Sequence, residues 1–135
     1  MIRNLNQMTF QSFGSVLSDR AQADKNNELV IPLSVDAEQV DVYQAASPTW
    51  INCSGGKAVL SVSSDGETYQ DFYLDKRACV SEGIYIVLYP FKGEANVTMT
   101  SGQKPRKVGT KENGSLREDP KMRVDGLYTF FYQER

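Results

Sequence analysis

The sequence predicts an all-β fold, a single barrel or jelly-roll domain that spans residues 1–135. Short strand-prone runs follow one another along the chain, and turn residues separate them about every 8–12 positions, which is typical of sandwiches and barrels. Two of these runs, residues 57–63 and 94–100, alternate between apolar and polar side chains. A period of two places one face of a strand in the core and the other toward water. The length is that of one domain with its own core.

Eight strands are expected. The first, at residues 29–33, contains Pro32, which has no amide hydrogen to donate and therefore favours the edge of a sheet. The last, at residues 127–132, is aromatic and strand-prone. The others lie at residues 40–43, 50–53, 57–63, 69–74, 84–89 and 94–100. Gly55 and Gly56 allow the positive φ of a tight hairpin between the third and fourth strands, and residues 64–66 and 81–83 are further turns.

The alternation within these strands also predicts the core. One face of each strand carries large apolar side chains, and these faces are expected to meet in a single core made of Leu60, Val62, Phe72, Leu74, Ile86, Leu88, Val97 and Met99. The opposite face of the strand at 57–63 carries Lys57, Ser61 and Ser63 beside Val59, so we expect it to face water.

Three regions are expected to lie outside the strands. Residues 9–17 begin a short helix, with Thr9 as its N-cap and Gly14 cutting it off. Residues 36–39 form a turn. Residues 101–119 contain almost no apolar side chains and form a long loop. The basic side chains of this loop, Lys104, Arg106 and Lys107, either grip a phosphate or polyanion or are simply solvated.

The charge of the chain argues against nucleic acid and membranes as partners. With 15 basic and 17 acidic residues the formal net charge is −2, which does not produce the positive surface that such partners attract. No stretch approaches the roughly 18 consecutive apolar residues of a membrane span, and the first ten residues lack the apolar run of a signal peptide. We therefore expect a cytoplasmic protein in which Cys53 and Cys79 are reduced.

The chain contains no histidine. Ser-His-Asp and Cys-His catalysis both need an imidazole to move the proton, so neither is available to this sequence. A facial iron triad needs two histidines, and a zinc site would have to be assembled from two cysteines and carboxylates. We expect neither a metal nor another cofactor.

Within the barrel class the chain resembles the cupins. The runs that carry this resemblance are a glycine-led strand, Gly56-Lys57-Ala58-Val59-Leu60-Ser61-Val62; the segment Phe72-Tyr73-Leu74, followed by Gly83 and a strand that ends at Pro90; and Ala95-Asn96-Val97. The run Phe10-Gln11-Ser12-Phe13-Gly14-Ser15-Val16-Leu17 is similar to the opening of ureidoglycolate lyases. The resemblance implies a cupin-like jelly-roll barrel with a short N-terminal helical segment. Many cupins carry histidines where this chain has Ile84, Ile86 and Val87, so no catalytic or metal-binding residue is transferred.

Aromatic and polar residues beside the predicted strands are candidates for a ligand pocket, because such pockets combine aromatic walls with a few fixed polar groups. They are Tyr43, Trp50, Asn52, Arg77, Tyr85, Tyr89, Lys92 and Glu94. The alternative is that the aromatic members are core or interface residues. Lys92 and Glu94 form either an acid–base pair or a solvated surface pair. The two cysteines are expected to be buried and structural.

Three classes of function remain compatible with these observations. The first is a metal-free domain that binds a small polar ligand, a sugar or a small carboxylate, in the barrel. The second is a metal-independent lyase or isomerase of the ureidoglycolate lyase-like type, and the third is a structural or interaction module. We favour binding, because the strong signatures of catalysis are missing from the sequence.

A homodimer is also expected. Residues 84–89 are apolar on both faces, whereas a strand in a single-layer barrel buries only one. Tyr85, Val87 and Tyr89 would then form an exposed apolar patch, and such patches often mark an interface. The competing account is that the N-terminal segment around Phe10, Phe13 and Leu17 covers this face within one chain.

We predict that elemental analysis of the purified protein finds no stoichiometric transition metal, because zinc and iron sites depend on histidine or on clustered cysteines. One equivalent of zinc or iron held by protein side chains would contradict this prediction.

Overall fold

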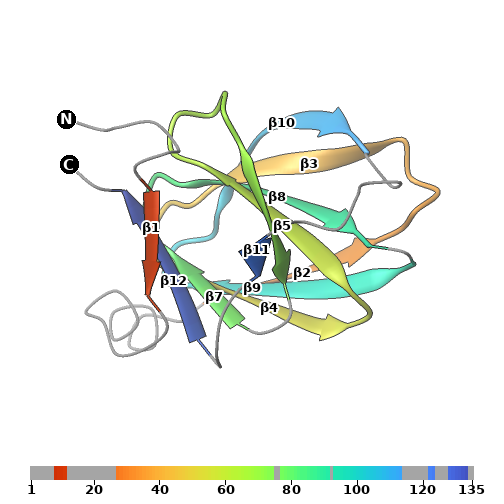
Figure 1. Ribbon diagram of the computed structural model, residues 1–135, viewed down its shortest axis with the longest axis horizontal. Coiled ribbons are helices and arrows are strands. Elements are labelled where there is room, and N and C mark those ends of the chain that lie inside the picture. Colours follow the sequence, from red (N-terminus) through yellow and green to blue (C-terminus); the bar gives the residue numbers. More distant parts are fainter. Residues whose placement is uncertain are drawn as a thin grey trace.

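The chain folds into two six-stranded β-sheets packed against each other (Figure 1). The computed structural model describes residues 8–11, 27–74, 77–91, 93–113, 122–123 and 128–133. Within this part of the chain there is no helix, and hence none long and apolar enough to cross a membrane. The prediction of an all-β fold is therefore confirmed.

The first sheet has β1 and β2 at its two edges. Its strands, in spatial order, are β1 (Met8–Gln11), β12 (Tyr128–Gln133), β7 (Arg77–Val80), β4 (Thr49–Gly55), β9 (Ala95–Ser101) and β2 (Asn27–Leu33). Neighbours run antiparallel except β12 and β7, which are parallel.

The second sheet has β10 and β11 at its edges. Its strands are β10 (Arg106–Glu112), β3 (Gln39–Gln44), β8 (Tyr85–Pro90), β5 (Ala58–Ser63), β6 (Gln70–Leu74) and β11 (Met122–Arg123). Here β11 and β6 are the parallel pair, and the other neighbours are antiparallel. Among the described strands no pairing joins the two sheets, so they form an open sandwich and not a closed barrel.

The main core lies between the two sheets. All eight residues predicted for it belong to one buried cluster, so the inward faces of β5, β6, β8 and β9 were assigned correctly. The first sheet also contributes Ile51 of β4 and Ala78 of β7 to this core, and both residues are fully buried. Facing side chains from two sheets interdigitate in this way in sandwiches.

A second apolar cluster lies on the outer face of the second sheet. It contains Val40, Val42, Val59, Val87, Tyr89 and Phe91, with Tyr69, Tyr73 and Tyr85 packed against it. Lys111 of β10 places its Nζ 3.6 Å from the centre of the Tyr69 ring, a favourable cation–π contact.

The second cluster explains why residues 84–89 are apolar on both faces. Ile86 and Leu88 face the main core, whereas Val87 and Tyr89 face outward but are only 0% and 4% exposed in a single chain. Val87 and Tyr89 therefore do not form the exposed patch on which the dimer prediction depended, and the homodimer stays a prediction. Ser61 and Ser63 are also buried, so the expectation that their face of β5 meets water was wrong.

The turn at Gly56 is a crossing between sheets and not the predicted hairpin. Its φ of 70° is positive as expected, but β4 and β5 belong to different sheets and do not pair. A Cβ on Gly56 would lie 2.1 Å from the Glu94 carbonyl oxygen, so glycine is needed both for the dihedral angle and for the close approach. Residues 64–66 do form a hairpin, which joins β5 to β6 and has Gly66 at φ 80°.

Two predicted non-strand regions contain strands. Met8–Gln11 is β1, paired with β12, so the predicted helix is wrong over residues 9–11, and its remainder lies outside the described residues. The predicted loop at 101–119 contains β10, which pairs with β3 and has a bulge between Lys107 and Gly109. Most side chains of β10 are exposed, which is why its sequence shows no apolar period.

Truncating Leu60 to Ala should lower the free energy of unfolding by about 2–5 kcal/mol, because Leu60 is fully buried at the centre of the main core. Denaturant titration measures this loss. Val30→Ala on edge strand β2, where the side chain is 56% exposed, should change stability by less than about 0.5 kcal/mol. Equal effects from the two variants would contradict the assignment of the core.

Candidate functional site

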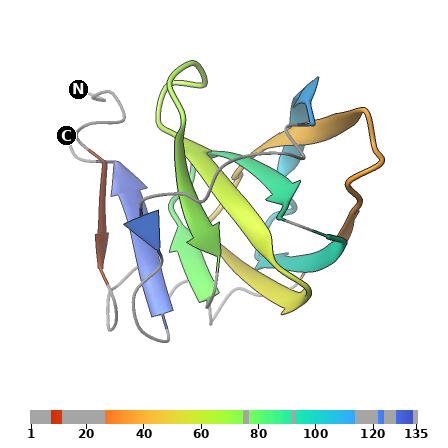
Figure 2. The same cartoon turned by 45° about the vertical axis from the view of Figure 1, so that its right-hand side comes forward.

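A small pocket opens between the sheets at β2, β3 and the loop that joins them. The loop that joins these strands lies at the side of the molecule away from β1 and β12 (Figures 1 and 2). The pocket has a volume of about 110 Å³. The described residues that line it are Ile31, Pro32, Leu33, Ser34, Ala37, Gln39, Val40, Asp41, Tyr43 and Leu88.

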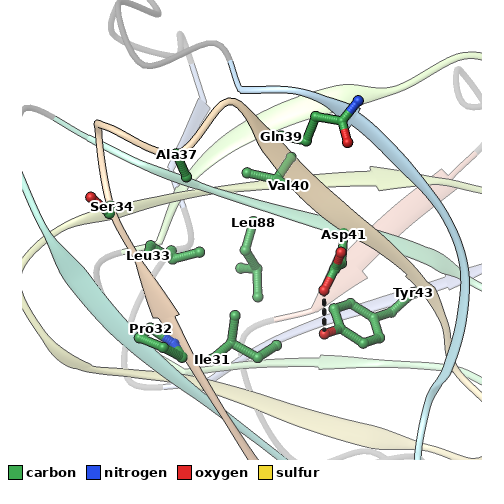
Figure 3. A pocket seen from close by; sticks show the side chains of 10 residues that line it. All are labelled: Ile31, Pro32, Leu33, Ser34, Ala37, Gln39, Val40, Asp41, Tyr43 and Leu88. Atoms are coloured by element: carbon green, nitrogen blue, oxygen red, sulfur yellow. Dashed lines mark hydrogen bonds between the residues drawn. The ribbon is translucent and has the colours of Figure 1, made fainter.

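The pocket has an apolar wall and a polar wall. Figure 3 shows Ile31, Leu33 and Leu88 around its apolar side, with Asp41 and Tyr43 together on the other. The three apolar residues are part of the main core or packed against it, so the pocket ends on the packed interior. A ligand with an apolar part and a polar part would match this division.

The strand geometry of β3 brings the polar side chains together. Asp41 and Tyr43 are two residues apart, so their side chains share one face of the strand. The Tyr43 hydroxyl donates a hydrogen bond to Asp41 Oδ2 over 3.3 Å (Figure 3). Burial raises the pKa of the Tyr43 hydroxyl above its ordinary value, and the charge of Asp41 and this hydrogen bond raise it further. Tyr43 is therefore a hydrogen-bond donor at neutral pH.

Strand β10 supplies a positive charge at the rim. Lys107 lies opposite Tyr43 in the β10–β3 register, which puts both side chains on the same face. Its Nζ is 3.2 Å from Asp41 Oδ1. The side chains of Lys107 and Asp41 are 57% and 40% exposed, so the pair is reachable from solvent.

Asn113, next to the end of β10, holds the loop that covers one side of the pocket. Its Nδ2 donates to the carbonyl oxygens of Ser34 and Ala37 at 3.0 and 2.7 Å, and its backbone N–H donates to the Glu38 carbonyl at 3.0 Å. Ser34 and Ala37 line the pocket, so these bonds fix one of its walls.

The sequence-predicted site residues do not gather in one place. Tyr43 lines the pocket. Trp50, Asn52 and Arg77 lie on the outer face of the first sheet, where Arg77 Cζ is 4.2 Å from the centre of the Trp50 ring. Tyr85 and Tyr89 belong to the outer cluster of the second sheet.

Two further candidates were assigned to an acid–base pair. Glu94 is exposed, and Lys92 lies outside the described residues, so the pair stays a prediction.

Cys79 is buried as expected, and burial raises the pKa of its thiol to about 12. Cys53 is half-buried, and burial likewise raises the pKa of its thiol. At neutral pH both sulfurs are thus protonated and weak nucleophiles.

Sequence reasoning missed Asp41 as a site residue, and it named Lys107 only as a candidate contact for a phosphate or polyanion, not as a member of this pocket. A signal for Asp41 was available, because the alternation of residues 40–43 puts it on the same face as Tyr43. No local signal could place Lys107 beside Asp41, since this contact depends on the pairing of β10 with β3.

The donor groups of the site suit hydrogen bonding and not metal binding. Among the described residues no three Cys, Asp or Glu side chains are grouped so that they could hold a metal ion. One carboxylate, one phenol and one ammonium instead provide an acceptor and two kinds of donor.

No protein-family model matches the chain, and no curated protein sequence matches it significantly.

Replacing Asp41 by Asn should lower the pKa of Tyr43, because it removes the negative charge and the charged acceptor that favour the protonated hydroxyl. Burial remains, so the value should fall only part of the way. An NMR titration of the tyrosine ring carbons follows this change. Asp36→Asn, an exposed neighbour outside the pocket, is the matched control and should leave Tyr43 unchanged. An unshifted Tyr43 in the Asp41 variant would refute the contact.

Proposed function

We propose that this protein is a metal-free, cupin-like jelly-roll domain that binds a small polar ligand, a sugar or a small carboxylate. The observation that carries the proposal is the pocket between β2 and β3, where Asp41 and Tyr43 stand opposite an apolar wall. A few fixed polar groups in an otherwise apolar concavity are typical of small-molecule sites.

The ligand binds at the margin of the sandwich and not at its centre. Ile51, Leu60 and Ile86 are fully buried between the sheets and belong to one packed cluster. Protein interiors packed in this way have few voids larger than a water molecule. We therefore assign the binding site to the edge of the sandwich and not, as the sequence predicted, to the inside of a barrel.

The size of the pocket limits the ligand. An apolar cavity of about 150 Å³ accommodates benzene. At about 110 Å³ the pocket between β2 and β3 is somewhat smaller. A three-carbon compound, or one end of a larger sugar, fits this space, with the rest of a larger ligand left in solvent.

The polar groups define the contacts of the ligand. The carboxylate of Asp41 accepts hydrogen bonds from ligand hydroxyl groups, and a bond to a charged acceptor is stronger than one between neutral groups. The Tyr43 hydroxyl and the Lys107 ammonium donate to ligand oxygens. The apolar wall covers the carbon skeleton.

Glycerol and lactate, added separately to the ¹⁵N-labelled protein, should shift the amide signals of residues 31, 33–43 and Leu88 with saturation. Asp41→Ala should weaken the binding of glycerol by a factor of about 10 to 150, since a charged hydrogen-bond acceptor is worth on the order of 1.5–3 kcal/mol. The dissociation constant from the NMR titration is the quantity to compare.

The matched control is Asp36→Ala, which removes an exposed carboxylate from the adjoining loop and should leave both dissociation constants unchanged. If neither compound perturbs the residues of the pocket at millimolar concentration, the proposed binding function is wrong.

A further inference from the structure

We propose that the preferred ligand of this pocket is a small zwitterion, an amino acid with a short aliphatic side chain. Its ammonium group binds Asp41 and its carboxylate binds Lys107. This inference rests on the proposed function, because it assigns a ligand class to the same pocket.

Two opposite charges lie side by side at the rim of the pocket. Lys107 Nζ and Asp41 Oδ1 are 3.2 Å apart, and both side chains are partly exposed. Each group keeps bonding capacity, since a carboxylate oxygen has two lone pairs and an ammonium has three N–H donors. A second ion pair can therefore be placed against the first without breaking it.

A zwitterion matches this arrangement better than a singly charged molecule. The pair of Asp41 and Lys107 has no net charge, so an anion is attracted by one partner and repelled by the other, and the same holds for a cation. An amino acid lying antiparallel to the pair meets an opposite charge at each end. Both charges of the amino acid are then attracted to the pair. The pocket therefore binds a zwitterion more tightly than an anion or a cation of the same size.

The surroundings favour the same class. The Tyr43 hydroxyl is held on Asp41 Oδ2, which keeps this carboxylate turned to the pocket. Glu38 and Glu112 lie beside the neighbouring shallow depression, together with Ala37 and Gln39, two residues that also line the main pocket. Their negative charge disfavours a ligand that carries only a carboxylate.

The apolar wall and the volume select the side chain. Ile31, Leu33 and Leu88 offer aliphatic contacts to a methyl or ethyl group, and about 110 Å³ leaves no space for an aromatic amino acid. Alanine has a suitable size and shape.

The test compares three compounds with the same three-carbon skeleton in NMR titrations of the full chain. Alanine carries both charges, lactate only the carboxylate, and alaninol only the ammonium. Alanine should bind about tenfold more tightly than either of the others. Asp41→Asn should reduce the affinity for alanine to that for lactate, and Lys107→Gln should reduce it to that for alaninol.

Two control variants make the same charge changes outside the pocket. Asp36→Asn and Lys104→Gln alter exposed side chains that do not line it and should bind alanine as the unmodified protein does. The Asp41 and Lys107 variants change partly exposed side chains to neutral ones of similar size, and their amide spectra report whether the fold is kept. If one of them fails to fold, the other decides.

The outcomes separate the two proposals. Equal affinity for alanine, lactate and alaninol at the pocket would overturn the zwitterion and leave the binding function standing. Tight alanine binding that neither variant weakens would also overturn it, since recognition would not use the ion pair. No perturbation of residues 31–43 by any of the three compounds or by glycerol would reject the binding function itself.

Discussion

Apolar packing between the two sheets is the constraint on which the other features of the protein depend. The inward faces of β4, β5, β8 and β9 close the interior with fully buried side chains, including Ile51, Leu60 and Ile86. Strand β5 is buried on its outer face as well, because a second apolar cluster covers that side of its sheet. With the interior filled, a polar group inside would lose its hydration without gaining a partner. The candidate polar site therefore lies at the margin of the sandwich.

At the margin formed by β2 and β3, the apolar packing between the sheets leaves room for a pocket. β2 is the edge strand of one sheet, and β3 lies next to the edge of the other, so the packing between the sheets ends there. Asn113 holds the loop between the two strands, since its side chain donates to two carbonyl oxygens of the loop and its backbone N–H donates to a third. The result is a small pocket with an apolar floor and a partly exposed polar rim.

The charges of the rim follow from the register of β10. Its pairing places Lys107 opposite Tyr43 and within an ion-pair distance of Asp41, and the bulge that follows at Val108 shifts the rest of the strand by one residue. A β-bulge redirects side chains in this way and is common near binding sites. The same strand sends Lys111 over the ring of Tyr69 on the outer face. Strand β10 thus links the pocket to the second apolar cluster.

The sequence by itself determined the all-β class, most of the strands and all eight predicted core residues, because the period-2 alternation reports directly which side chains avoid water. It also indicated the turns at Gly56, Gly66 and Gly83, each of which has a positive φ. Only the tertiary structure decided that β4 and β5 pair in different sheets, that the polar segment after Ser101 contains an edge strand, and that Lys107 meets Asp41 across 66 positions of sequence. The physical reason is that strand pairing joins residues far apart in the chain, and an edge strand with both faces hydrated carries no apolar period from which its place could be inferred.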